Sequence, residues 1–136
     1  MVSTGVNYLA VLVAGAAYMV LGALWYSPVL FANAWMKGIG KTKEQIAKDF
    51  SPFSYVWAIL TSLIASYGIA RVFSYTGGSG IADGILISLL IGVCFVLTAL
   101  WVNGVFEGRP RGLILINVFY HLIGLVLTGI IIGAWR

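Results

Sequence analysis

Charged residues are scarce in this sequence: Asp, Glu, Lys and Arg make up 9% of its 136 residues, whereas 61% are hydrophobic. A soluble domain usually carries about 25% charged residues. This chain therefore has too few charges to cover a surface that faces water. The composition excludes an ordinary soluble protein and indicates one whose solvent is a lipid bilayer.

Cysteine and histidine are equally rare, since the sequence holds one of each, Cys94 and His121. A single cysteine excludes an internal disulfide, and we expect Cys94 to pack as a small buried hydrophobe. So few cysteines, histidines and acidic residues do not supply a close set of metal ligands. The sequence shows no nucleophile–base pair, phosphate-binding loop or nucleotide motif. We therefore expect neither enzyme activity nor a metal or cofactor.

Basic residues outnumber acidic ones by eight to four, a balance that can indicate nucleic-acid binding. Here the basic residues gather in loops beside apolar segments. That placement is typical of membrane orientation and of attraction to anionic lipid. We expect the lipid bilayer, and not nucleic acid, to be the partner.

Four long apolar segments fill most of the chain, at about residues 6–27, 53–74, 81–103 and 113–135. Each has about the 20 residues that a helix rising ~1.5 Å per residue needs to cross a ~30 Å hydrocarbon layer. The predicted fold is all-α, a single polytopic membrane domain over residues 1–136 with four transmembrane helices. The first segment is too long for a removable signal, and no Lys or Arg precedes it, so we expect it to remain as a span.

The connecting segments carry signals of their own. Thr42 followed by Gln45 is typical of a capping box that opens a short polar helix. Ser51 and Pro52 suit the N-cap and first position of the second membrane helix. We expect Asp83 in the first turn of the third helix, where negative charge is favourable.

Orientation follows from the basic residues of the short loops, since Lys and Arg are favoured on the cytoplasmic side. Arg71 and Arg136 fall on the side of the two termini. We therefore expect a cytoplasmic membrane with both charged loops inside and both termini extracytoplasmic. The basic residues of these two loops are Lys37, Lys41, Lys43, Lys48, Arg109 and Arg111.

A short internal repeat links the first and third segments. Residues 20–25 read Val-Leu-Gly-Ala-Leu-Trp, and residues 96–101 read Val-Leu-Thr-Ala-Leu-Trp. Because the two helices cross in the same direction, the repeat predicts two tandem helical hairpins of parallel orientation. Coincidence among apolar residues is the alternative.

Small residues recur at helical spacing in the third and fourth segments. Gly84, Ser88 and Gly92 share one face, and Gly129 and Gly133 form a GxxxG pair. Such residues let helices approach closely in lipid, so we expect them to pack helices within the chain or between copies of a homo-oligomer. The tryptophans near helix ends, which we expect to anchor the membrane interface, are Trp25, Trp35, Trp101 and Trp135.

His121 lies inside the fourth segment, where ionisable groups are costly and each is a candidate site. Asn117 precedes it by four residues, and Thr128 continues the same face. We expect this polar stripe to face the bundle or another copy. The opposite face is predicted to hold the apolar residues Val118, Leu122 and Leu125.

Ser27 and Asn103 are predicted to lie in the same half of the membrane, so three helices can contribute to one polar cluster. One hypothesis is that this cluster binds or conducts a small solute or ion. The other is that its groups only hydrogen-bond one another and hold the bundle, in an accessory subunit that packs against itself or a larger membrane complex. The candidate ligand-binding residues are His121, Asn117, Asn103, Ser27 and Tyr120.

Glu107 and Arg109 lie in the second charged loop, beside the predicted cluster. They could form a gate or an anion contact. The alternative is a charged turn that fixes topology, because an exposed ion pair contributes little energy.

Five short stretches carry a resemblance to a known family. They are residues 24–28 (Leu-Trp-Tyr-Ser-Pro), 35–36 (Trp-Met), 106–110 (Phe-Glu-Gly-Arg-Pro), 116–117 (Ile-Asn) and 120–122 (Tyr-His-Leu). With these stretches the chain resembles, over nearly its full length, the membrane protein family called domain of unknown function 1761. The resemblance implies a small four-helix membrane protein, chiefly microbial. It implies no activity, ligand or catalytic residue.

Overall fold

The computed structural model describes residues 5–135, and every regular element in that range is helical. The elements are α1 (Tyr8–Trp25), α2 (Ala32–Ile39), α3 (Lys43–Asp49), α4 (Pro52–Tyr75), α5 (Gly80–Ile91), the π-helical η1 (Gly92–Leu97), α6 (Thr98–Phe106) and α7 (Arg111–Ala134).

Within residues 5–135, four helical stretches are long and apolar enough to cross a membrane. Their bounds are Tyr8–Trp25, Pro52–Tyr75, Gly80–Phe106 and Arg111–Ala134, close to the four segments predicted from hydrophobicity. The third stretch joins α5, η1 and α6. The all-α class and the four spans are thus confirmed, and the chain is a multi-pass membrane protein.

The helix starts follow the signals in the sequence. The capping box is present, because Thr42 Oγ1 accepts from Gln45 N at 3.2 Å and Gln45 Oε1 accepts from Thr42 N at 2.8 Å. Pro52 occupies the first turn of α4. Asp83 lies in the first turn of α5, where its carboxylate accepts from the backbone N–H of Ser79 at 2.8 Å.

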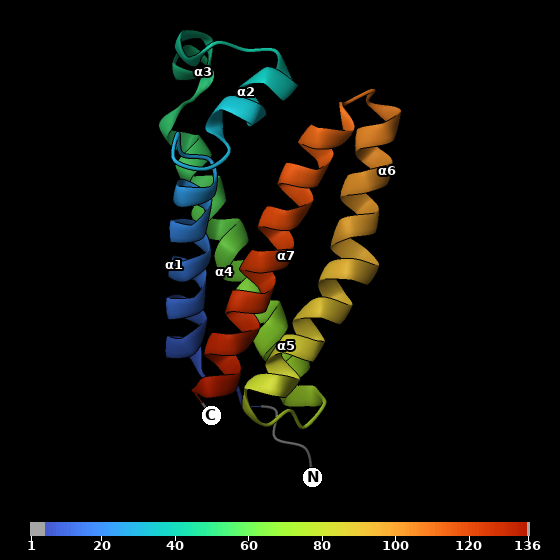
Figure 1. Ribbon diagram of the computed structural model, residues 1–136. Coiled ribbons are helices and arrows are strands. Elements are labelled where there is room, and N and C mark those ends of the chain that lie inside the picture. Colours follow the sequence, from blue (N-terminus) through green and yellow to red (C-terminus); the bar gives the residue numbers. More distant parts are fainter. Residues whose placement is uncertain (1–4, 136) are drawn as a thin grey trace.

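The two ends of the bundle differ in what they carry (Figure 1). α1 begins and α7 ends at the same end, together with the turn between α4 and α5. We call this the termini end. α2, α3 and the turn between α6 and α7 lie at the opposite end. We call it the charged-loop end, because both lysine- and arginine-bearing loops project from it.

α7 is the central helix of the bundle. It packs along α1, α4 and the α5–η1–α6 stretch, and it also contacts α2. The contacts therefore do not divide into two separate hairpins, and the tandem-hairpin arrangement stays a prediction. The matching tryptophans of the repeat differ in environment, since Trp25 is buried and Trp101 is exposed.

The backbones of α5 and α7 touch at the termini end. A Cβ added at Gly84 would overlap the backbone carbonyl of Gly129, and one at Gly133 would overlap the carbonyl of Gly80. Backbone therefore touches backbone, as small residues permit in lipid. The expectation that these glycines pack helices is confirmed, and they do so within the chain.

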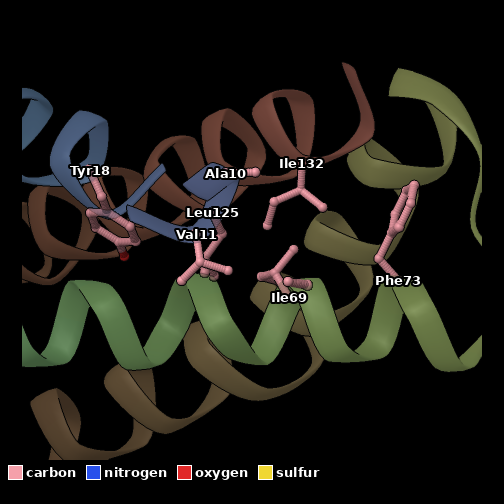
Figure 2. Close-up of a cluster of buried hydrophobic side chains, with 8 residues drawn as sticks. Ala10, Val11, Tyr18, Ile69, Phe73, Leu125 and Ile132 are labelled. Carbon is pink, nitrogen blue, oxygen red and sulfur yellow. The ribbon is translucent and has the colours of Figure 1, made fainter. Parts of the chain in front are cut away.

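The apolar core also lies toward the termini end, between α1, α4 and α7 (Figure 2). In the close-up, Ile69 of α4 and Ile132 of α7 face each other, and Phe73 closes one end of the cluster. By contrast, none of the first ten residues of α4, at positions 52–61, is buried. The helices pack tightly at one end and loosely at the other.

Two of the predicted environments are wrong. Cys94 is exposed, because α5 and η1 bury only the stripe of Gly84, Ser88 and Gly92, and Cys94 lies off that stripe. Trp25 is buried, and its indole N–H donates to the carbonyl of Ile116 at 3.0 Å. This tryptophan ties α1 to α7 instead of anchoring the interface.

The predicted division of α7 into a polar and an apolar face is also wrong. Val118 and Leu125 are buried at 2% and 4% exposure. With 3.6 residues per turn, Leu125 lies only about 40° around the helix from His121. The face that points outward carries Leu115, Phe119 and Ile123, all exposed.

Candidate functional site

Side chains of α1 and α7 meet in one hydrogen-bonded group in the middle and charged-loop part of the bundle. α7 supplies Asn117, Tyr120 and His121, and α1 with its C-cap supplies Tyr18 and Tyr26. We call these five residues the aromatic–polar cluster. The sequence predicted the three residues of α7.

His121 is held by a tyrosine from the neighbouring helix. The Tyr18 hydroxyl lies 2.6 Å from Nδ1 of His121, and the two rings meet edge-on with centroids 6.0 Å apart. Tyr18 is itself buried, with 4% exposure. When its hydroxyl donates to Nδ1, the neutral imidazole carries its proton on Nε2. The contact therefore holds the ring, and in this tautomer the remaining donor is the N–H of Nε2.

Asn117 is held in the same way, one turn nearer the charged-loop end. The Tyr26 hydroxyl donates to Oδ1 of Asn117 at 2.8 Å. Tyr26 is positioned in turn by Trp35 of α2, whose ring lies edge-on with centroids 5.5 Å apart. With its oxygen engaged by Tyr26, the Asn117 side chain presents its NH₂ group to the surroundings.

Tyr120 lies between the other aromatic rings of the cluster. Its centroid is 5.3 Å from that of Tyr18, 5.4 Å from Tyr26 and 4.8 Å from His121. Its hydroxyl donates to the backbone carbonyl of Tyr18 at 3.3 Å. The pairs with Tyr18 and Tyr26 are edge-to-face, an arrangement that stabilises packing by about 0.5–1.5 kcal/mol per pair. Tyr120 therefore joins the two hydrogen-bonded pairs into one unit.

Two glycines make room for the rings. A Cβ at Gly22 would lie 2.8 Å from the Tyr120 hydroxyl, and one at Gly124 would lie 2.6 Å from the ring of Tyr18. Each glycine belongs to the helix opposite the ring that it admits. The cluster therefore depends on small residues on both helices as well as on the polar ones.

Two nitrogens of the cluster stay available to a ligand. Nε2 of His121 and Nδ2 of Asn117 have no hydrogen-bond partner among residues 5–135. In that range, the buried side-chain polar atoms without a partner are the hydroxyls of Ser66 and Ser88. The two nitrogens are not in that set, so they reach the protein surface.

Two of the predicted site residues lie outside the cluster. The Ser27 hydroxyl donates to the carbonyl of Leu24 at 2.6 Å and so caps its own helix end. Asn103 is exposed on α6, which packs against η1 and α7. Equal depth in the membrane predicted that these residues meet, but depth does not determine which way a side chain points around its helix.

The charged turn contains the expected ion pair. Arg109 Nε lies 2.6 Å from a carboxylate oxygen of Glu107, with both side chains about half exposed. Such a pair contributes roughly 0–1 kcal/mol. Gly108, with φ +69°, lets the chain reverse between them. The geometry is that of a charged turn, and the cluster residues bond to α1 instead of to this turn.

Tyr18, Trp25 and Tyr26 were not predicted as site residues. They share one face of α1 with Gly22, because residues separated by four or by seven or eight positions align on a helix. Aromatic residues lining up with a glycine on the first helix are the signal that could have indicated this face. The hydrophobicity of α1 does not reveal this face, because tyrosine and tryptophan count as hydrophobic residues.

The π-helical segment η1 was not predicted either. A Cβ at Gly92, where it begins, would lie 2.7 Å from Leu122, the neighbour of His121 in sequence. A π-helical turn inserted in an α-helix is frequent at functional sites. Here it is packed against α7 at the height of the aromatic–polar cluster.

Residues 5–135 contain no group of three His, Cys, Asp or Glu side chains that could hold a metal ion. The cluster offers neutral hydrogen-bonding groups: three phenols, one amide and one imidazole. Its chemistry is suited to holding a polar molecule by hydrogen bonds.

A family model described as "Protein of unknown function (DUF1761)" matches residues 9–133. A search of curated proteins and a search of solved structures each found no match. The match includes all five residues of the aromatic–polar cluster. A family without an assigned activity gives these residues no role.

Proposed function

We propose that the aromatic–polar cluster binds a small solute or anion that accepts hydrogen bonds. The chain belongs to the DUF1761 family of proteins of unknown function. The main support is that Tyr18 hydrogen-bonds to Nδ1 of His121 and that Tyr26 hydrogen-bonds to Oδ1 of Asn117. In the tautomer in which Tyr18 donates to Nδ1, the accessible nitrogens of both His121 and Asn117 are donors.

His121 and Asn117 project from the same face of α7, so we infer that one small ligand can reach both donors. His121 and Asn117 are four residues apart on α7, so their Cβ atoms are about 5–6 Å apart on one face. Their rotamers are fixed by tyrosines from another element, which lowers the entropy lost when a ligand binds. A carboxylate, an amide carbonyl or an inorganic anion presents suitable acceptors.

Access is proposed from the charged-loop end. At ~1.5 Å per residue, His121 lies on the order of 15 Å along α7 from its first residue. The first ten residues of α4 bury no side chain, and the only buried residue of α6 is Gly104. The loose packing at this end supports entry of a solute to the depth of the cluster, and conduction beyond it would need the core to open.

A thermal-shift experiment tests binding. The purified protein is heated in detergent with acetate, acetamide, chloride or inorganic phosphate, and unfolding is followed by tryptophan fluorescence. A bound ligand at 100 times its Kd stabilises the folded state by about 2.7 kcal/mol. We expect at least one of these compounds to raise the unfolding temperature of the parent, and Asn117→Leu and His121→Phe to abolish that shift.

Asn103→Leu is the matched control, since Asn103 is exposed and outside the cluster. It should keep the full shift. If no compound in the panel raises the unfolding temperature, or if Asn117→Leu and His121→Phe respond as the parent does, the binding proposal is wrong.

For orientation, we propose a cytoplasmic membrane with the charged-loop end inside and both termini outside. The support is the concentration of lysine and arginine in the loops at that end. Single cysteines at Lys41, Arg109 and Gly77, each in a Cys94→Ala background, can be labelled in intact cells with a membrane-impermeant maleimide. Only the Gly77 variant should react before lysis. Labelling of Lys41 and Arg109 variants on different sides would contradict the shared placement of their loops.

An accessory role in a homo-oligomer or larger complex is the second candidate. Gly129 and Gly133 are engaged within the chain, so the surface for such contacts lies elsewhere. Phe53 and Trp57 of α4, 71% and 66% exposed, offer an aromatic face at the loosely packed end. Disulfide cross-linking of Trp57→Cys in a Cys94→Ala background should then give a dimer in membranes, and a monomer only would count against this role.

A further inference from the structure

Arg71 is a cation inside a membrane span. It lies four residues before the end of α4, at the termini end of the bundle. Charged groups within a span are costly and mark functional positions. Because Arg71 is far along the bundle from the aromatic–polar cluster, its role is separate from the proposed function.

Aromatic side chains fix the position of this cation. Arg71 Nε donates to the Tyr67 hydroxyl at 2.8 Å. Its guanidinium carbon lies 5.4 Å from the ring centroid of Tyr67 and 5.7 Å from that of Tyr75, one turn to either side. Tyr8 of α1 stacks on Tyr67 with centroids 6.4 Å apart. An arginine that only extends to water does not need contacts with aromatic rings. The protein therefore sets the depth of the Arg71 charge in the membrane.

An apolar groove adjoins the same tyrosines. It has a volume of about 340 Å³ and lies between α1 and α4. Tyr8 and Tyr67 form its end nearest Arg71, and the remaining lining residues lie deeper in the bundle. These deeper residues are Val11, Leu12, Leu63 and Ile64.

We propose that Arg71 and this groove together bind one anionic phospholipid, with its phosphate at the guanidinium and an acyl chain in the groove. The charge is complementary, and the guanidinium fork is the side chain best matched to phosphate oxygens. The groove continues from Arg71 toward the membrane centre, the direction in which an acyl chain runs from its headgroup. Tyr8 and Tyr67 lie between the two parts, where aromatic rings with a polar tip are favoured.

Native mass spectrometry of the detergent-purified protein tests the site. Phosphatidylglycerol, which is anionic, should be retained more strongly than phosphatidylcholine, which is zwitterionic. Arg71→Gln should lower phosphatidylglycerol retention about tenfold, the effect of losing charge-assisted hydrogen bonds. Ile64→Trp, which fills the groove, should lower retention of both lipids.

Two controls separate this site from other effects. Arg109→Gln removes a cation at the opposite end and should retain phosphatidylglycerol as the parent does, while Arg71→Lys should fall between parent and Arg71→Gln. An excess of inorganic phosphate should not displace the lipid. Parent-like retention by both Arg71→Gln and Ile64→Trp, or displacement by phosphate alone, would overturn the proposal.

Discussion

The two ends of this bundle are held together by different chemistry. At the termini end, glycine carbonyls of α5 touch glycines of α7, and aliphatic side chains of α1, α4 and α7 fill the space beside them. At the charged-loop end, aromatic rings and hydrogen bonds join α1 to α7, while α4 and α6 remain largely exposed. At the termini end the backbones are in direct contact, which leaves no room for larger side chains. At the charged-loop end the polar groups could bond to the proposed ligand as well as to each other.

This difference has a physical origin in the membrane. Apolar side chains gain nothing by leaving lipid tails for one another, so helix association depends on close packing and on hydrogen bonds. Glycine permits the close packing, and tyrosine supplies the hydrogen bonds. The two ends of the protein separate these contributions along one helix, α7.

The largest effect is expected from Gly129→Leu. A side chain there meets the backbone of Gly84 and the hydroxyl of Ser88, neither of which can move away easily. We expect a loss of about 3 kcal/mol, at the upper end of the range for overpacked cores, measured by SDS-induced unfolding in mixed micelles. The control is Gly68→Leu, because a Cβ at Gly68 has no neighbour within 4 Å. Equal stability of the two variants would contradict the close packing assigned to the termini end.

A smaller effect is expected at the aromatic–polar cluster from Tyr18→Phe. It removes the hydroxyl that contacts His121 and keeps the buried ring. A double-mutant cycle with His121→Phe should give a coupling of about 0.6 kcal/mol, the average for such pairs in a membrane protein. A coupling near zero would show that this contact does not hold α1 and α7 together, and it would contradict a structural role for the Tyr18–His121 pair.

The smallest effect is expected from Cys94→Ala. Cys94 is exposed and belongs to neither end's packing, so the free energy of unfolding should change by less than about 0.5 kcal/mol. The same unfolding assay checks this, and it also validates the cysteine-free background used for labelling. A change above 1 kcal/mol would place Cys94 in a contact between copies.

Predictions from spacing succeeded where the signal is local. The capping box at Thr42 and the first-turn position of Asp83 follow from a few neighbouring residues. They failed where direction around a helix matters: Asn103 points outward, and Leu125 lies beside His121 instead of opposite it. Tyr18 was missed because its partner, His121, lies 103 residues away in sequence.

Hydrophobic length and loop charge are properties of each segment alone, so they were enough to predict the lipid environment, the four spans and the shared side of both charged loops. The folded bundle was needed to show that α7 is central, that the glycines pair within the chain, and that Tyr18 and Tyr26 orient His121 and Asn117. Those features depend on the rotation of each helix about its axis. In lipid, hydrophobicity does not set that rotation, and interhelical packing and hydrogen bonds do.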